Sequence, residues 1–241
     1  MKDIDAIAML QDPVRRRLYE YVAAQGREVG RNEAAEAAGV ARTLAAHHLD
    51  RLTEAGLLES GSRRLTGRSG PGAGRPAKVY TRARAERSVS LPRRDYLSAA
   101  ELLAEAAEQA GLDAVLCAAA GRRGEALRGS APPCGDLEEA VQMLAGRGYE
   151  PYLAGDGDAE DAQGAEGDAA VAGAAGPAER VVRMRNCPFH AVAERFPPLV
   201  CGMNLALLEG LFGVDGPVHA RMDARPGECC VVVEASKSKD H

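Results

Sequence analysis

Apolar residues recur at helical spacing near the start of the chain. Val14, Leu18, Tyr21 and Val22 follow an i, i+4, i+7, i+8 pattern, which indicates a helix that buries one face. Asp12-Pro13 precedes this stretch and is typical of a helix start, with Asp as N-cap and Pro in the first turn. The pattern therefore predicts an amphipathic helix that opens at this pair.

Two further helices are predicted over residues 32–38 and 41–55, separated by Gly39. Glycine turns the chain there at low cost because it adopts positive φ readily. Ala45, Leu49 and Leu52 form the inward stripe of the second of these helices, with His48 beside it as a packed, hydrogen-bonded histidine rather than a base reader. The residues predicted to face outward are Arg42, Thr43, Ala46, His47 and Arg51. Two helices joined by a tight turn are typical of a helix-turn-helix, whose second helix fits the major groove of DNA.

A basic, glycine-rich segment follows the helices. Residues 60–85 hold seven Lys or Arg and no Asp or Glu, and they contain a short strand-like run at 78–81. A cationic hairpin beside a helix-turn-helix is suited to contact phosphates or the minor groove. The segment therefore predicts a wing, and residues 1–90 a winged helix-turn-helix domain.

The remaining residues, 91–241, are predicted to form an α+β domain that dimerises and carries the cysteines. Long helices of the kind predicted just after the wing commonly pair across a dimer axis. The predicted helices cover residues 96–110, 112–120, 137–145 and a region that is interrupted at Pro197-Pro198 and runs through 201–212. The predicted strands cover residues 149–153, 181–187, 218–222 and 229–234. Residues 154–178 are acidic and rich in Ala and Gly, which predicts a disordered loop between two strands of a hairpin.

Composition and charge narrow the class of protein. The net charge of −5 over 241 residues divides unevenly, because residues 1–94 hold 18 basic and 11 acidic residues whereas residues 95–241 hold 12 and 24. This asymmetry suggests a basic module for a polyanion joined to an acidic module with another task. No run of 18 apolar residues and no signal-peptide pattern is present, so we expect a cytoplasmic protein and no membrane partner.

Three of the six cysteines lie at the ends of predicted elements. Cys187 ends a strand, Cys201 opens a helix and Cys229 opens a strand, with gaps of 13 and 27 residues between them. These gaps are too wide for a zinc knuckle, but they allow a site assembled from three element ends, and thiolates select soft metals and iron–sulfur clusters. From spacing alone Cys201 could equally be a small core residue. Cys117 and Cys134 are interpreted as bystanders.

Residues 47–58, HHLDRLTEAGLL, and residues 74–80, GRPAKVY, resemble the winged-helix regulators of the ArsR type. The resemblance implies that Arg42, Thr43, Ala46 and His47 reach base edges. Together with the basic residues of the recognition helix and wing, the predicted DNA-contacting set is Arg42, Thr43, Ala46, His47, Arg51, Arg75 and Lys78. Asp50 departs from the family pattern, where many members carry a cation, and it would repel phosphate if it faced DNA.

Residues 186–190, NCPFH, with residues 199–201, LVC, and Cys229 in a final strand, resemble the iron–sulfur-sensing repressors of the SufR type. The resemblance implies Cys187, Cys201 and Cys229 as ligands of an iron–sulfur cluster, which we expect to be [4Fe–4S] rather than [2Fe–2S]. The fourth ligand stays open between Cys230, His190, a carboxylate and a small molecule.

These observations predict a homodimeric, non-enzymatic transcriptional repressor of palindromic double-stranded DNA, in which the cluster reports redox, iron or nitric-oxide status. The alternatives are sensing through zinc, sensing through a cysteine thiol switch, and a C-terminal domain that only dimerises. An enzyme built on Cys187 and His190 is disfavoured, because no third orienting group accompanies the pair.

Overall fold

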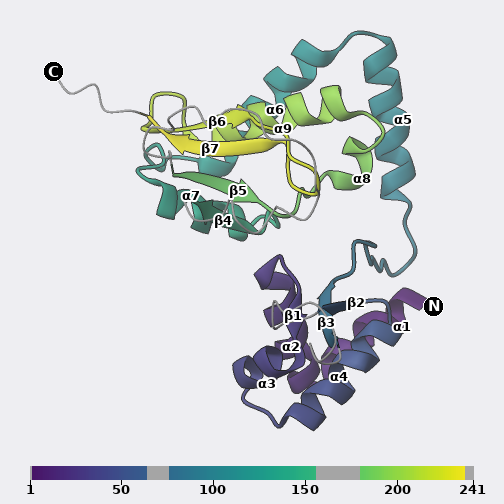
Figure 1. The fold of residues 1–241 in the computed structure, drawn as a ribbon. Helices are drawn as coiled ribbons and strands as arrows, with labels where there is room; N and C mark the ends of the chain where they lie inside the picture. The colour runs from purple at the N-terminus through teal and green to yellow at the C-terminus, as the bar shows by residue number, and fades with distance from the viewer. Residues whose placement is uncertain (1, 64–75, 156–179, 237–241) are drawn as a thin grey trace, which may run out of the picture. The chain divides into compact units, whose positions relative to one another are not determined.

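The computed structural model describes residues 2–63, 76–155 and 180–236 (Figure 1). The chain divides into two compact units, Met1–Arg94 and Asp95–His241. None of the helices within the described residues is long and apolar enough to cross a membrane. The mixture of helices and two small sheets makes the fold α+β, as predicted.

The N-terminal unit contains helices followed by a hairpin. Its helical elements are α1 (Lys2–Ala8), η1 (Met9–Gln11), α2 (Pro13–Gln25), α3 (Arg31–Ala38) and α4 (Arg42–Glu54), and its strands are β1 (Val29–Gly30), β2 (Leu58–Arg63) and β3 (Ala77–Arg82). The strands form one antiparallel sheet in the order β1-β3-β2. The sequence pattern did not predict α1, η1 or β1. The tip of the predicted wing lies outside the described residues.

Local chemistry accounts for the ends of the three central helices. The Asp12 side chain accepts hydrogen bonds from the backbone N–H groups of Val14 and Arg15, at 2.9 and 3.0 Å, and thereby caps α2. Gly39 joins α3 to α4 with a φ of 64°. The predicted inward stripe of α4 is confirmed, because Ala45, Leu49 and Leu52 are all buried in one core.

The C-terminal unit is built around a four-stranded antiparallel sheet in the order β4-β5-β7-β6. Its helices are α5 (Tyr96–Gln109), α6 (Asp113–Arg128), α7 (Leu137–Ala145), α8 (His190–Ala193) and α9 (Pro197–Phe212), and its strands are β4 (Pro151–Ala154), β5 (Val181–Met184), β6 (Val218–Met222) and β7 (Val231–Ala235). β4 and β5 pair as the predicted hairpin. Most of the predicted loop 154–178 lies outside the described residues, and its first residue, Ala154, belongs to β4.

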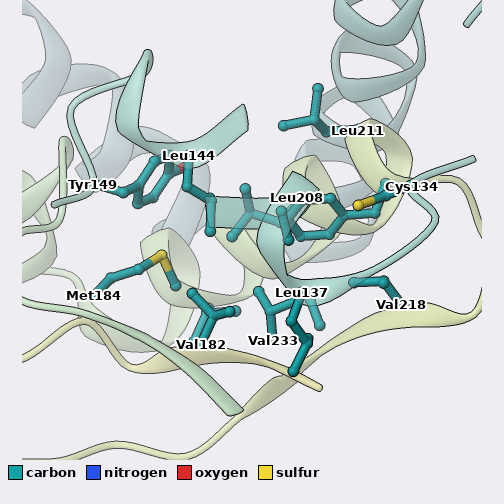
Figure 2. Packing of buried hydrophobic residues seen from close by; sticks show 14 of the residues in the cluster. Cys134, Leu137, Leu144, Tyr149, Val182, Met184, Leu208, Leu211, Val218 and Val233 are labelled. Atoms are coloured by element: carbon teal, nitrogen blue, oxygen red, sulfur yellow. The ribbon is translucent and has the colours of Figure 1, made fainter. Parts of the chain in front are cut away.

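Helices α7 and α9 supply the apolar side chains that pack on this sheet (Figure 2). Leu144 of α7 and Leu208 of α9 are fully buried together with Val182 and Met184 of β5 and Val233 of β7. The core therefore fixes α9 against the middle of the sheet.

Glycines allow α6 and α9 to pack very closely. A Cβ on Gly124 would overlap the carbonyl oxygen of Leu207 and lie 2.7 Å from the backbone nitrogen of Leu211, and a Cβ on Gly210 would lie 3.0 Å from the carbonyl carbon of Gly121. The predicted end of this helix at Ala120 was wrong. α6 continues through its glycines to Arg128, because packing against α9, which leaves no room for a side chain at Gly124, outweighs the low helix propensity of glycine.

Candidate nucleic-acid interface and cysteine site

The first residues of α3, the hairpin strands and Arg42 of α4 border a polar hollow in the N-terminal unit. Its lining includes Arg31 at the start of α3, Arg42 at the start of α4, and Arg63 and Lys78 from the two hairpin strands. Within the described residues, Arg63 pairs with Glu28 at 3.6 Å and Lys78 with Asp50 at 2.7 Å, whereas Arg42 has no ion pair. Arg42 is therefore the cation of this surface that is most available to a phosphate or a base.

Asp50 connects α4 to the hairpin and to α3. Its Oδ1 accepts hydrogen bonds from the Tyr80 hydroxyl at 2.6 Å and from Lys78 Nζ at 2.7 Å, and its carboxylate pairs with Arg31 at 3.3 Å. Burial favours the protonated form of Asp50, but the bonds from Lys78 and Tyr80 outweigh it and lower its pKa. The carboxylate is thus used inside the unit and does not face outward as an unpaired charge.

Tyr80 is the buried centre of this network. Its side chain is fully buried, and its hydroxyl accepts a hydrogen bond from Arg31 Nε at 2.9 Å while it donates to Asp50. Burial, with the bond to the Asp50 carboxylate, raises the pKa of Tyr80 to about 12. The hydroxyl therefore stays protonated and continues to donate at neutral pH.

In the C-terminal unit, strand register brings distant residues to one end of the sheet. Asn186 N–H donates to the Tyr149 carbonyl at 3.2 Å, so the residues just before β4 lie beside those just after β5. Cys229 N–H donates to the carbonyl of Met184, the last residue of β5, at 2.9 Å, and this bond continues the β5–β7 pairing past the start of β7. Cys187 and Cys229, 42 residues apart in the sequence, consequently become neighbours.

Four cysteines form two pairs at this end of the sheet. The Cys187 thiol hydrogen-bonds to the sulfur of Cys229. Cys201, on α9, forms a disulfide with Cys230, with the two Cα atoms 6.5 Å apart. Because Cys229 and Cys230 are consecutive, the two pairs are joined through one peptide bond. Residues from three separate parts of the chain thus supply four sulfur atoms to one region.

The sulfur of Cys229 is surrounded by donors. Asn204 Nδ2 donates to it at 3.5 Å, and the thiol of Cys187 and the backbone N–H groups of Val231 and Cys230 lie near it. The neighbouring Cys187 thiol and these N–H groups outweigh burial and lower the pKa of Cys229, while the interaction with Cys229 and burial raise the pKa of Cys187. Of the two neighbouring thiols, Cys229 is the one that ionises first.

A buried arginine holds the loop that leads into Cys229. Arg183 of β5 is 1% exposed, and it pairs with Asp223 at 2.5 Å and with Glu228 at 3.5 Å. The Tyr152 hydroxyl donates to the same Glu228 carboxylate. These contacts fix both ends of the β6–β7 connection and hence the position of Cys229, which follows Glu228.

Residues 10–61 match a family model described as a helix-turn-helix domain. This range spans α2 to α4 and most of β2. Residues 10–61 form a helix-turn-helix domain. Such a domain is typical of DNA-binding transcriptional regulators, and it supports DNA binding by this chain. Comparisons with curated proteins and with solved structures found no match.

The helix-turn-helix domain presents most of the predicted DNA-contacting residues on one helix. Arg42, Thr43, His47 and Arg51 are exposed on α4, and Ala46 is half-buried among them. Lys78 lies on β3, with its ammonium group on Asp50. Arg75 lies outside the described residues.

The two histidines of α4 differ in environment. His47 is exposed, as its outward position predicts, whereas His48 is half-buried. Burial lowers the pKa of His48, and within the described residues its Nδ1 has no hydrogen-bond partner. His48 therefore packs beside the core, but the predicted hydrogen bond is not made at Nδ1.

The predicted cluster ligands lie in one region, but they are not gathered as a metal site. Among residues 2–63, 76–155 and 180–236, no three Cys, His, Asp or Glu side chains are arranged to hold a metal ion. Cys187 and Cys229 touch, whereas Cys201 is bonded to Cys230. His190 is 63% exposed and pairs with Glu194 at 3.2 Å. The cysteines fit a cluster in donor type and location, and the fit requires Cys201 and Cys230 to be reduced.

Three site residues were missed by sequence reasoning. Tyr80 and Tyr149 are bulky residues in or beside strands, and the sequence pattern does not distinguish them from ordinary core residues. Asn204 did carry a signal, because it is the one amide in the otherwise apolar run from Leu199 to Leu208. A buried amide within such a run indicates a specific hydrogen-bond partner.

Proposed function

We propose that the chain is a cytoplasmic, homodimeric repressor that binds a palindromic operator and whose C-terminal unit holds an iron–sulfur cluster on Cys187, Cys201 and Cys229. The observation that carries this proposal is the meeting of four cysteines from three elements at one end of a sheet. Soft thiolate donors in such a set suit an iron–sulfur cluster. Cys230 is the favoured fourth ligand, because it is already bonded to Cys201.

The cysteine site connects three elements of the C-terminal unit, namely β5, α9 and β7. Cys187 follows β5, Cys229 and Cys230 precede β7, and Cys201 lies in the second turn of α9. A bound cluster supplies an electron acceptor that is altered by oxidants, nitric oxide and iron shortage. When all four sulfurs act as ligands, α9 is tied to the end of the sheet. When the cluster is lost and Cys201 and Cys230 stay reduced, α9 is free to shift with α6, which packs closely along it.

Helix α5 is the proposed dimer contact. It carries three large apolar side chains that are mostly exposed, namely Tyr96, Leu102 and Leu103 at 73%, 67% and 71%. Exposure of these apolar side chains to water is unfavourable in a single chain, whereas contact with a second copy would bury them. Two-fold symmetry would then match the two halves of a palindromic operator.

Light scattering after size-exclusion chromatography tests this dimer. The wild-type chain is expected to run at twice the mass of one chain, and Leu103→Glu at the mass of one. Val214→Glu changes an equally exposed apolar residue, 69% exposed and outside α5, and it should leave the mass doubled. A Leu103→Glu chain that remains dimeric would contradict the placement of the interface on α5.

A thiol switch is the second candidate, and the Cys201–Cys230 disulfide favours it. Here the two thiols lose two protons and two electrons to an oxidant such as hydrogen peroxide, which becomes two molecules of water. No iron or sulfide is then needed. A third candidate is sensing through a zinc ion bound by the reduced cysteines, and a protein that binds only zinc is colourless.

Mobility-shift assays distinguish these functions. A duplex is first selected from a random pool by the anaerobically purified chain, and its affinity is then compared for cluster-loaded, cluster-free reduced, and peroxide-treated protein. Cluster sensing predicts that the loaded and the cluster-free reduced forms differ. A pure thiol switch predicts that these two bind alike and only the peroxide-treated form differs. Equal binding by all three forms would contradict both.

A further inference from the structure

Asn204 is an unusual residue for its position. It lies in the middle of α9 and is fully buried, and apart from Arg183 it is the only buried polar residue in the described part of the chain. Its neighbours along the helix are apolar. Burial of an amide destabilises the fold unless both its oxygen and its nitrogen are hydrogen-bonded. The hydrogen-bond partners of Asn204 therefore explain how it is accommodated in the core.

Both ends of this amide have a partner. The hydroxyl of Tyr149, itself 2% exposed, donates to Oδ1 at 2.6 Å. On the other side Nδ2 donates to the sulfur of Cys229 at 3.5 Å. Because the Tyr149 hydroxyl occupies the oxygen end, the nitrogen end of the amide is turned toward the sulfur. The three residues form a chain of contacts from Tyr149, two residues before β4, through α9, to Cys229, two residues before β7.

This chain ends on a proposed cluster ligand. Asn204 gives this sulfur a side-chain N–H donor at 3.5 Å, beside the backbone N–H groups of Val231 and Cys230. Hydrogen bonds to ligand sulfurs stabilise negative charge and raise the reduction potential of a cluster. Among these donors only the Asn204 amide belongs to a side chain that substitution can remove without altering the backbone.

We propose that Asn204, oriented by Tyr149, is a positioning residue that directs an N–H group at the Cys229 sulfur and thereby sets the reduction potential of the cluster. This inference rests on the proposed function. It assigns Asn204 a role beyond satisfying the Tyr149 hydroxyl, and the two roles predict different outcomes when each partner is changed separately.

The test is an anaerobic redox titration of the reconstituted full-length chain, followed by its visible spectrum. Asn204→Leu keeps the approximate size of the side chain and removes the donor. Tyr149→Phe keeps the ring and the Asn204 amide but removes the hydroxyl that orients it. Gln142→Leu is the matched control, because it also replaces a side-chain amide of the same unit by leucine, at an exposed position of α7.

Removal of the donor should disfavour the reduced cluster. Asn204→Leu is expected to shift the one-electron reduction equilibrium about tenfold toward the oxidised form, which is about 59 mV more negative. Tyr149→Phe should shift it in the same direction by less, the double variant no further than Asn204→Leu alone, and Gln142→Leu not at all.

The outcomes separate this inference from the proposed function. A wild-type chain without iron and sulfide after reconstitution overturns both. A fully loaded chain whose potential is unchanged by Asn204→Leu and Tyr149→Phe overturns only the role of Asn204. If Asn204→Leu fails to fold, Tyr149→Phe decides, since an unshifted potential in that variant overturns the proposal.

Discussion

The Tyr80 hydroxyl donates to Asp50 Oδ1 at 2.6 Å and so joins the wing strand to the recognition helix. Tyr80 lies on β3 and Asp50 on α4, 30 residues apart in the sequence. The bond explains how an acidic residue is accommodated on the helix proposed to contact DNA. Its charge is balanced by Lys78 and Arg31, and the same contacts hold the hairpin in place.

Tyr80→Phe should loosen the hairpin without changing the outer face of α4. The substitution removes one buried hydrogen bond to a charged acceptor, at a cost of about 1.5–3 kcal/mol of unfolding free energy. Hydrogen–deuterium exchange on the full chain should show faster exchange of the β3 amides paired with β2. Tyr152→Phe, in the other unit, provides the control. Unchanged β3 protection would show that the bond does not hold the hairpin.

Asp50→Asn should remove part of the acid sensitivity of the N-terminal unit. The folded-state pKa of Asp50 lies below its ordinary value of 3.8, so the carboxylate stabilises the fold at neutral pH, and this contribution is lost as the pH falls below 3.8 toward the folded-state value. Thermal unfolding from pH 7 to pH 3 should show the wild type more stable near neutrality, with the difference shrinking below pH 3.8. A difference that grows in acid would contradict the sign.

Arg42→Ala should weaken DNA binding more than any change at Lys78. Arg42 is exposed at the start of α4 without an ion pair in the described residues, whereas Lys78 is held by Asp50. Loss of a base contact costs about 1–3 kcal/mol, and loss of a phosphate contact reduces the salt dependence by about one unit of slope. Arg225→Ala, an exposed arginine of the C-terminal unit, is the control. Equal affinities of Arg42→Ala and wild type for a selected duplex would remove Arg42 from the interface.

The sequence predicted those parts of the fold that depend on local periodicity. The stripe of Ala45, Leu49 and Leu52 and the glycine turn at Gly39 follow from spacing and from φ, and both are confirmed. By contrast, the Asp50 network and the pairing of Cys201 with Cys230 depend on strand register and on helix placement. Both the network and the disulfide join residues that are 28 or more positions apart in the sequence, and local sequence patterns do not predict contacts over such separations.

Gly124→Ala should destabilise the C-terminal unit strongly. The new methyl group would overlap the Leu207 carbonyl oxygen on α9, and backbone cannot move aside as a side chain can, so a loss of about 2–4 kcal/mol in unfolding free energy is expected.

Gly121→Ala is the matched control, one helical turn earlier. Its methyl group would lie 3.7 Å from the Ala206 carbonyl oxygen, an ordinary contact, and alanine is favoured over glycine in a helix by up to about 1 kcal/mol. Urea denaturation followed by circular dichroism compares the two variants. Equal midpoints would contradict the close packing of α6 on α9.

The central claim is that Cys187, Cys201 and Cys229 hold an iron–sulfur cluster. The most direct measurement is the iron and acid-labile sulfide content, with the visible spectrum, of the anaerobically purified and reconstituted chain beside its three single Cys→Ser variants. The account predicts a brown wild type with about four iron and four sulfide per chain for a [4Fe–4S] cluster, and loss of most of both in each variant. A colourless wild-type chain without sulfide would contradict it.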